Sequence, residues 1–343
     1  MVLKSYCAMD LHHSHTVFEA QSGQGQVTLH RDMATERTFL VEAVKAVRGP
    51  KGVVIEEGPM ADWAMRMIRP YVAEVVVCDP RRNRLISDDG DKSDRIDVGK
   101  LVQLYRLGAL RRVHHSALRS RVDLREWVWS YHDQVRLVVA AKNKVKAAFR
   151  SAGLQYGSSD IYGRTNRSSW LGTLVRGSER RRMEVLYGNL DDLERRREAM
   201  HQRICRLVRR HPVVSRFLEI PGYGPVRGVT FFVIVDTPFR FPRVSKLWRY
   251  GGLGLRQRQS GPPGDEKRFR DVQYNRRLKE VAMGATVSAL SGRDDNPFKR
   301  VYERLVESGR SEGLSRLSVA RKLLSVPWGR WKGGTRYDPG LVS

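Results

Sequence analysis

The sequence has few cysteines and no long hydrophobic run. Its three cysteines, Cys7, Cys78 and Cys205, are an odd number and lie far apart. This spacing argues against a disulfide scaffold and against a cysteine zinc site, and it fits a reducing cytosol. A membrane-spanning helix needs about 18 apolar residues in a row. The longest clear apolar run, residues 228–235, has only the length of a strand. No basic stretch followed by a long apolar segment marks a secretory signal.

Acidic residues are also scarce. The 343 residues include 63 Lys and Arg but only 37 Asp and Glu, so the formal net charge is +26. Such an excess opposes compaction unless counter-ions or phosphates neutralise it, which makes nucleic acid the expected partner. A composition of 41% hydrophobic and 29% charged residues is typical of a globular protein and excludes a disordered one. The length predicts about two domains.

The first third of the chain predicts an α/β domain, which we assign to residues 1–115. Strand patterns occur at residues 6–10, 16–20, 26–29, 53–55 and 72–78. Apolar residues at helical spacing occur at residues 35–47, 61–68 and 94–107. Because strands alternate with helices, we expect a sheet that includes parallel pairs.

The pattern becomes helical beyond residue 115. Apolar residues recur at alternating four- and three-residue steps over residues 124–149 and again over 183–207, and one basic residue, Lys142 or Arg197, interrupts each series. Such heptad seams predict two helices. They form either an antiparallel hairpin within one chain or a coiled coil between chains, and the sequence leaves both open. We assign this helical insert to residues 116–210 and a mainly α-helical domain to residues 211–343.

Two segments of the C-terminal part combine glycine or tryptophan with basic residues. Residues 220–225, Ile-Pro-Gly-Tyr-Gly-Pro, have the form of a hairpin between two helices. Backbone N–H groups at Gly222 and Gly224 would bind phosphate oxygens without reading base sequence, and a plain Gly-Pro turn is the alternative. Residues 328–334 mix tryptophan with Arg and Lys, which is typical of a flexible nucleic-acid contact or of a disordered end.

Four acidic residues occupy positions that favour a metal site. Asp10 and Glu56 each end a predicted strand, and Asp94 and Asp97 are three residues apart, on one helix face. Four carboxylates brought together repel one another unless divalent cations neutralise them. Oxygen ligands suit Mg²⁺ or Mn²⁺, and a pair of such ions about 4 Å apart can support phosphoryl transfer. Taken singly, Asp94 fits a helix N-cap and Asp97 a partner for arginine.

The residues around these acids resemble the RuvC-like domain, of ribonuclease H fold, of DEDD-type insertion-sequence transposases, the insertion sequence 110 class. Strand register favours Glu56 over the neighbouring Glu57 as the glutamate of this motif. The matching segments are residues 9–10 (Met-Asp), 54–58 (Val-Ile-Glu-Glu-Gly), 78–81 (Cys-Asp-Pro-Arg) and 90–97 (Gly-Asp-Lys-Ser-Asp-Arg-Ile-Asp). The resemblance places the family tetrad on Asp10, Glu56, Asp94 and Asp97.

The second half is similar to the transposase domain of the same family. The similar segments are residues 219–225, residues 250–255 and the Ser260-Gly261 pair. One residue differs, because Tyr274 stands where the family usually has glycine before Asn275 and a basic helix. With the helical insert between them, the two similar regions cover most of the chain.

The resemblance implies a recombinase that excises and inserts its own mobile element. Its partners would be donor (element-end) DNA, target DNA and a structured noncoding bridge RNA that pairs with both. Ser260 would attack a phosphodiester, leaving a covalent phosphoserine link and a free 3′ hydroxyl, while the acidic tetrad with Mg²⁺ assists from a neighbouring subunit. The protein would therefore be a homo-oligomer, a dimer or tetramer. It would lie in the bacterial cytoplasm, at the nucleoid and not at a membrane.

Several basic residues would contact the nucleic acid. Arg256, Arg258 and Lys267 are close to Ser260 in sequence and would screen phosphate charge. Arg276 and Arg277 begin the basic helix. Two other functions stay open: a junction-resolving nuclease in which the tetrad activates water, and a catalytically silent nucleic-acid-binding scaffold. In the nuclease, Ser260 is only structural.

Overall fold

The computed structural model describes residues 2–79, 94–116, 119–157, 160–258, 267–270 and 273–342, and for residues 94–95, 119, 255–258 and 267–270 it describes the main chain. The chain divides into two compact units, an N-terminal unit of residues 1–117 and a C-terminal unit of residues 118–343. Within the ranges given, no helix has both the length and the apolar character needed to cross a bilayer.

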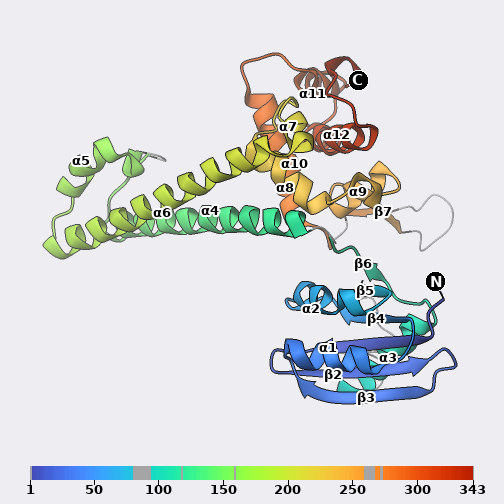
Figure 1. Ribbon diagram of the computed structural model, residues 1–343. Coiled ribbons are helices and arrows are strands. Elements are labelled where there is room, and N and C mark those ends of the chain that lie inside the picture. Colours follow the sequence, from blue (N-terminus) through green and yellow to red (C-terminus); the bar gives the residue numbers. More distant parts are fainter. Residues whose placement is uncertain are drawn as a thin grey trace. The chain divides into compact units, whose positions relative to one another are not determined.

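A six-stranded mixed sheet forms the centre of the N-terminal unit (Figure 1). Its strands are β1 (Ser5–Leu11), β2 (His15–Ser22), β3 (Val27–Ala34), β4 (Lys51–Glu56), β5 (Glu74–Cys78) and β6 (Arg112–Val113). The strand order is β3-β2-β1-β4-β5-β6. β1 is antiparallel to β2 but parallel to β4, and β4 is parallel to β5. The carboxyl ends of β1, β4 and β5 therefore meet at one edge, and the predicted α/β class is confirmed.

Helices cover both faces of this sheet. The helices are α1 (Arg37–Ala46), α2 (Ala61–Ile68) and α3 (Asp94–Arg106), and the short η1 (Arg69–Tyr71) follows α2. α1 and α2 bury one face, which includes Met9 and Ile55. α3 buries the opposite face, which includes Ala8 and Val54. This division follows from the two-residue period of a strand, since neighbouring side chains point to opposite faces.

Two long helices, α4 (Arg119–Ser151) and α6 (Gly177–Arg209), pack against each other as a hairpin within the C-terminal unit (Figure 1). Both predicted heptad seams lie inside these helices, and they meet within the chain, for example where Val138 of α4 packs with Leu190 of α6. The far end of the hairpin holds η4 (Asp160–Tyr162), η5 (Arg164–Asn166) and α5 (Arg167–Gly172). The seams thus form the intrachain hairpin that the sequence left as one of two alternatives.

The remainder of the C-terminal unit is mainly helical, as predicted. Its elements are α7 (Pro212–Phe217), α8 (Pro225–Val235), η6 (Pro238–Arg240), α9 (Val244–Tyr250), β7 (Leu255–Arg258), β8 (Lys267–Arg270), α10 (Arg276–Ser291), α11 (Pro297–Glu307), α12 (Glu312–Gly333) and η7 (Pro339–Leu341). β7 and β8 form a separate antiparallel hairpin.

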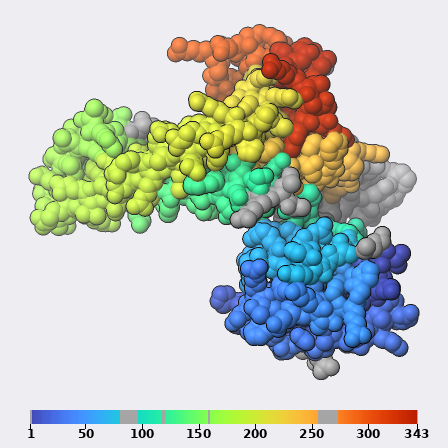
Figure 2. All heavy atoms as spheres, in the orientation of Figure 1, coloured from blue at the N-terminus to red at the C-terminus, as the bar shows by residue number. Residues whose placement is uncertain are grey.

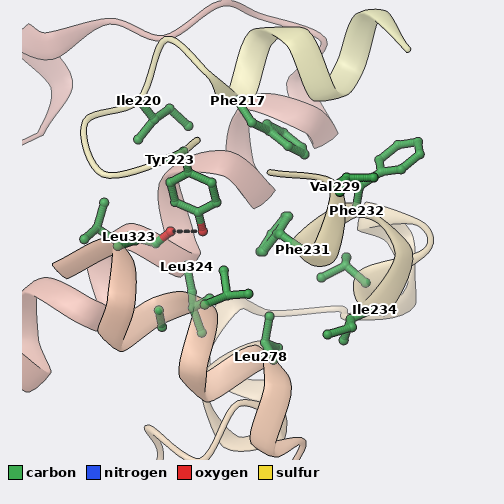
Figure 3. Close-up of a cluster of buried hydrophobic side chains, with 14 of the residues drawn as sticks. Phe217, Ile220, Tyr223, Val229, Phe231, Phe232, Ile234, Leu278, Leu323 and Leu324 are labelled. Carbon is green, nitrogen blue, oxygen red and sulfur yellow. Dashed lines mark hydrogen bonds between the residues drawn. The ribbon is translucent and has the colours of Figure 1, made fainter. Parts of the chain in front are cut away.

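Residues 228–235, the apolar run that has the length of a strand, are the buried part of α8, the helix that follows the predicted turn at 220–225. Every residue from Gly228 to Val235 is buried, and the ring of Phe231 packs edge-on against the rings of Phe217 and Tyr223 (Figure 3). A helix that is apolar on all sides belongs in a protein core. Periodicity does not distinguish such a helix from a buried strand in a run this short.

The expectation of a flexible or disordered segment at residues 328–334 is also wrong. Residues 328–333 are the last turns of α12. Trp328 Nε1 donates a hydrogen bond to the carbonyl of Pro238 at 2.8 Å, and the ring of Trp331 packs on Phe232 with centroids 5.0 Å apart. Both tryptophans therefore hold α12 to the helices before it.

The turn at residues 220–225 connects α7 to α8 and is fixed by packing. Gly222 has a φ of +87°, and a Cβ atom there would lie 2.2 Å from the carbonyl oxygen of Ala285 in α10. Tyr223 is buried, and its hydroxyl donates to the carbonyl of Leu323 at 2.7 Å (Figure 3). The turn between two helices was predicted, and close contact with α10 and α12 explains its glycine.

The two glycines of this turn provide a matched pair of substitutions. Gly222→Ala should destabilise the protein by about 3 kcal/mol, because it combines a left-handed backbone with a clash against the main chain of α10. Gly224 has a φ of −102°, and no atom lies within 4 Å of where a Cβ atom would be, so Gly224→Ala should change stability by less than about 1 kcal/mol. Urea unfolding followed by circular dichroism measures both, and equal effects would contradict this role for Gly222.

Candidate functional site

Asp10 and Glu56 lie on the same side of the sheet, at the carboxyl ends of two neighbouring parallel strands. The register pairs β1 with β4 as far as the residue before each acid. Ala8 and Val54, two residues before each acid, pack beneath α3. Since side chains alternate along a strand, Asp10 and Glu56 are placed on the α3 face as well. Glu57 follows the strand and is exposed, so the geometry favours Glu56 as the member of the cluster.

Three other carboxylates act on Glu56. Burial raises the pKa of the Glu56 carboxyl above its ordinary value, and the negative charges of Asp10, Asp97 and Asp79 raise it further. These acids come from β1, from α3 and from the residue that follows β5. Like charges disfavour ionisation only at short range. The strand ends and α3 therefore concentrate negative charge around Glu56.

The donor chemistry of this cluster fits a hard divalent cation. All of its oxygen atoms belong to carboxylates, which are the ligands that Mg²⁺ and Mn²⁺ prefer, and a cation would relieve the repulsion at Glu56. Asp94 is the first residue of α3, but its side chain is not among those described. Across the side chains that are described, no three of the His, Cys, Asp and Glu residues are close enough together to hold a metal ion.

Two residues at the acidic cluster were not predicted. His12 Nε2 lies 3.3 Å from Asp10 Oδ2, and the His12 ring stacks on His15 with centroids 5.6 Å apart. Asp79 directly follows β5, just as Glu56 ends β4. The position of Asp79, immediately after an apolar strand, could have predicted from the sequence that it joins the cluster. The contact of His12 depends on the tight turn between β1 and β2, which residue types alone do not specify.

A second candidate site is a cavity of about 340 Å³ at the base of the hairpin. It is bounded by α4, α6, α8 and α10, and its lining includes His132, Gly224, Arg227, Arg277 and the acid Glu280. Gly224 is the N-cap of α8 and has no side-chain oxygen to cap the helix. The N-terminus of α8 and two guanidinium groups thus border one cavity.

The histidine in this cavity is neutral near pH 7. Burial lowers the pKa of His132 to about 4, and the positive charge of Arg277 contributes to the shift. His132 Nε2 lies 3.0 Å from the hydroxyl of Thr230, which itself donates to the carbonyl of Val226 at 2.7 Å. Nε2 therefore carries the hydrogen. The positive charge of the cavity comes from its arginines, which suits a phosphate oxygen.

The predicted nucleic-acid-binding residues occupy different environments. Gly224 and Arg277 line the cavity, and Arg277 also stacks on the ring of Trp129 at 4.5 Å. Gly222 instead packs against α10. Arg276 is the exposed first residue of α10, where the side chain of Asn275 accepts a hydrogen bond from the Leu278 amide at 2.9 Å as the N-cap.

The predicted nucleophile lies outside the described residues. Ser260 falls between β7 and β8, as does Gly261. Arg256 and Arg258 are on β7 and Lys267 is on β8, where the register pairs Arg258 with Lys267. Only the main chain is described there, so the roles of these four residues stay predictions.

Residues 214–303 match the family model described as Transposase IS116/IS110/IS902 family. Over these residues the chain is similar to a transposase domain of this family. The family is one of transposases, which act on DNA, so the match supports the expected class of enzyme, a DNA phosphoryl-transfer enzyme. No curated protein matches the chain. The transposase domain includes the turn at 220–225, the arginines of the cavity and the segment that contains Ser260.

We expect Glu56→Gln to raise the unfolding temperature at about pH 7 without divalent cations, because the amide removes a buried charge that three carboxylates repel. Since the pKa of Glu56 is raised in the folded state, the folded protein binds this proton more tightly than the unfolded chain does. The charged carboxylate therefore costs stability above the folded pKa, and the gain from Glu56→Gln should vanish as the pH falls below the unfolded pKa.

Scanning calorimetry of metal-free protein at several pH values measures this effect. The matched control is Glu57→Gln, which removes a charge from the exposed neighbour and should change stability by less than about 0.5 kcal/mol. A lower unfolding temperature for Glu56→Gln at neutral pH would show that the cluster is not repulsive.

Proposed function

We propose that this transposase is an RNA-guided DNA recombinase in which Ser260 is the nucleophile and the acidic cluster is the metal site. The observation that carries the proposal is the convergence of Asp10, Asp97 and Asp79 on Glu56 in a chain of net charge +26. A strongly basic protein gains nothing for stability from gathering its acids at one point. A cluster of carboxylates can hold the divalent cations that support phosphoryl transfer on DNA.

Asp10, Glu56, Asp94 and Asp97 would hold Mg²⁺ or Mn²⁺. When bound, the metal supplies Lewis-acid stabilisation of the phosphate charge and of the leaving oxygen. His12, through its contact with Asp10 at 3.3 Å, restrains the carboxylate in one orientation. The packing of α3 on the sheet keeps Asp97 near the strand ends. A mixed sheet with carboxylates at its strand ends also supports a RuvC-like identity for the N-terminal unit.

The proposed reaction exchanges one phosphodiester for another. The Ser260 hydroxyl oxygen attacks phosphorus, its proton passes to a base, and the bond from phosphorus to the 3′ oxygen breaks as that oxygen takes up a proton. The products are a phosphoserine link to the 5′ side and a free 3′ hydroxyl. Because the ester bond is kept, a later attack by a 3′ hydroxyl can release Ser260 and join new strands without another energy source. Arg256, Arg258 and Lys267 would screen the phosphate.

The nucleic-acid partners follow from charge and from the family. Gly224 and Arg277 at the hairpin-base cavity would hold a backbone phosphate, and the exposed Arg276 would contribute to the same surface. Donor DNA and target DNA are the substrates, and the bridge RNA would choose both by base pairing. A composite site built from Ser260 of one subunit and the acids of another makes a dimer or tetramer necessary. The site of action would be the bacterial nucleoid.

A junction-resolving nuclease is the second candidate. The acidic cluster belongs to the N-terminal unit and Ser260 to the C-terminal one. Hydrolysis by activated water would need only the former, and Ser260 would then be a turn residue. The two functions differ in whether a DNA strand becomes covalently attached to the protein.

Incubation with element-end DNA, its flanking noncoding RNA and Mg²⁺, followed by a denaturing gel, detects that attachment. We expect the wild type to form the adduct, Ser260→Ala to form none, and Asp97→Asn to lower strand transfer at least about 100-fold. Ser291→Ala, a change at an exposed serine that ends α10, is the matched control and should behave as the wild type. Metal-dependent cutting by Ser260→Ala would instead establish the nuclease, and binding without chemistry in any variant would establish a scaffold.

A further inference from the structure

The far end of the α4–α6 hairpin carries an arginine cluster that the proposed chemistry does not use. We define the hairpin-end cluster as Arg176, Arg180, Arg181 and Arg182, which face a single acid, Glu179, within residues 176–182. All four arginines are exposed, and the side chain of Arg176 is 79% exposed. Figure 2 shows the hairpin end as a lobe of light-green spheres at the molecular surface. The cluster therefore presents a local net charge of 4 − 1 = +3.

The position of this cluster is unfavourable for the stability of helix α6. It lies in the first two turns of α6, near the positive end of the helix dipole, and its cations also repel one another, as Arg176 and Arg180 do at a spacing of four residues. Arg181 Nη1 even lies back over Gly177, 3.7 Å from where a Cβ atom there would be. At the opposite end of α6, Arg206 and Arg209 stand where the dipole favours cations. Helix stability thus explains the arginines at the C-terminus of α6 but not the hairpin-end cluster.

The cluster stands on a rigid base. Phe149, Ile161 and Met183 form a small core beneath it. The hydroxyl of Tyr187 donates to the carbonyl of Ile161 at 2.8 Å, and Arg180 Nη2 donates to the carbonyl of Leu174 at 3.2 Å. This core fixes the main chain that carries the cluster before any partner binds, which lowers the entropy cost of binding.

The neighbouring Arg167 shows what a structural arginine looks like at this end of the hairpin. Two of its nitrogens donate to the two carboxylate oxygens of Asp191, each at 2.8 Å, and its side chain is only 12% exposed. Arg176 reaches its one acid, Glu179, at 4.0 Å while remaining open to solvent. Arg167 stabilises the fold through a half-buried pair, whereas Arg176, Arg181 and Arg182 are exposed to solvent.

We propose that the hairpin-end cluster binds the phosphodiester backbone of a nucleic acid without reading its sequence, as an anchor separate from the transposase domain. Guanidinium groups bind phosphate oxygens in pairs, and a polyanion is the partner whose evenly spaced charges offset the electrostatic cost of the cluster. The inference rests on the proposed function only in that nucleic acid is the partner. It needs neither Ser260 nor the acidic cluster.

Two arginine pairs on the same helix allow a matched test. Arg181→Gln with Arg182→Gln removes two charges from the hairpin-end cluster. Arg195→Gln with Arg196→Gln removes two exposed charges from the middle of α6, where Asp192 contacts Arg195. We expect the first variant to bind a non-element DNA duplex about 10-fold more weakly at about 0.1 M salt, and its slope of log affinity against log salt to fall by about 1–2. The control should bind as the wild type does.

The probes are a DNA duplex and an RNA duplex of equal length and unrelated sequence. A reduced salt slope with either probe supports the proposal, and a reduction with only one identifies that nucleic acid as the partner. Unchanged slopes with both probes would overturn it. Unchanged slopes together with a smaller oligomer in light scattering would also overturn it, because the cluster would then bind an acidic surface of a second copy.

The unfolding temperature and the Ser260 adduct distinguish a failure of this proposal from a loss of folding and from a failure of the proposed chemistry. The unfolding temperature of Arg181→Gln with Arg182→Gln should be equal to that of the wild type or higher, since the change relieves repulsion at the N-terminus of α6. A lower unfolding temperature would contradict the argument that the cluster carries an unfavourable excess of positive charge. Loss of the Ser260 adduct leaves the salt slope as it was, so failure of the proposed chemistry and failure of this anchor are distinguishable.

Discussion

Mutual repulsion among carboxylates at the edge of the sheet is the interaction on which the structure of the site depends. Asp10 and Glu56 lie at the carboxyl ends of neighbouring parallel strands, and the charge of Asp97, on α3, acts on Glu56. The apolar layers on the two faces of the sheet hold these elements in register, so they offset a repulsion that would otherwise separate the acids. The N-terminal unit therefore maintains a local negative site within a chain of net charge +26.

Positive charge is concentrated at separate places in the C-terminal unit. At the base of the hairpin, Arg227 and Arg277 border a cavity in which burial keeps His132 neutral. At its far end, Arg181 and Arg182 are exposed beyond a small core of their own. The long helices α4 and α6 run between these two places and keep the two concentrations of positive charge apart. Each point is held by packing, so binding need not first order the chain.

The sequence pattern predicted those helices and strands that are specified by residues close together in the chain. The α2 helix has the predicted bounds, and the heptad seams fall inside α4 and α6. Glu56 ends its strand as predicted, and Asp10 is the residue before the last one of its strand. The apolar run at residues 228–235 has the length of a strand, and its periodicity does not distinguish a strand from a buried helix. It is helical, and the core surrounds it on all sides. The tail tryptophans are ordered by Pro238 and Phe232, which lie far away in sequence. A local sequence pattern does not predict contacts between residues so far apart in the chain.

The cavity at the hairpin base was missed for a similar reason, because four helices distant in sequence create it. Its members Gly224 and Arg277 were noticed individually, but nothing in the sequence brings them together. The acidic site was more accessible to prediction, since parallel strands bring their carboxyl ends to one edge. His12 and Asp79 complete it through a tight turn and a third strand end.

The binding of Mn²⁺ to the acidic cluster tests the central claim most directly. Calorimetric titration of wild type and of Asp10→Asn, each without nucleic acid, measures it. We expect Mn²⁺ to bind the wild type and to raise its unfolding temperature with increasing concentration, and we expect Asp10→Asn to lose both effects while keeping its fold. Equal Mn²⁺ affinity and equal stabilisation in the two proteins would show that the carboxylates at the strand ends are not a metal site.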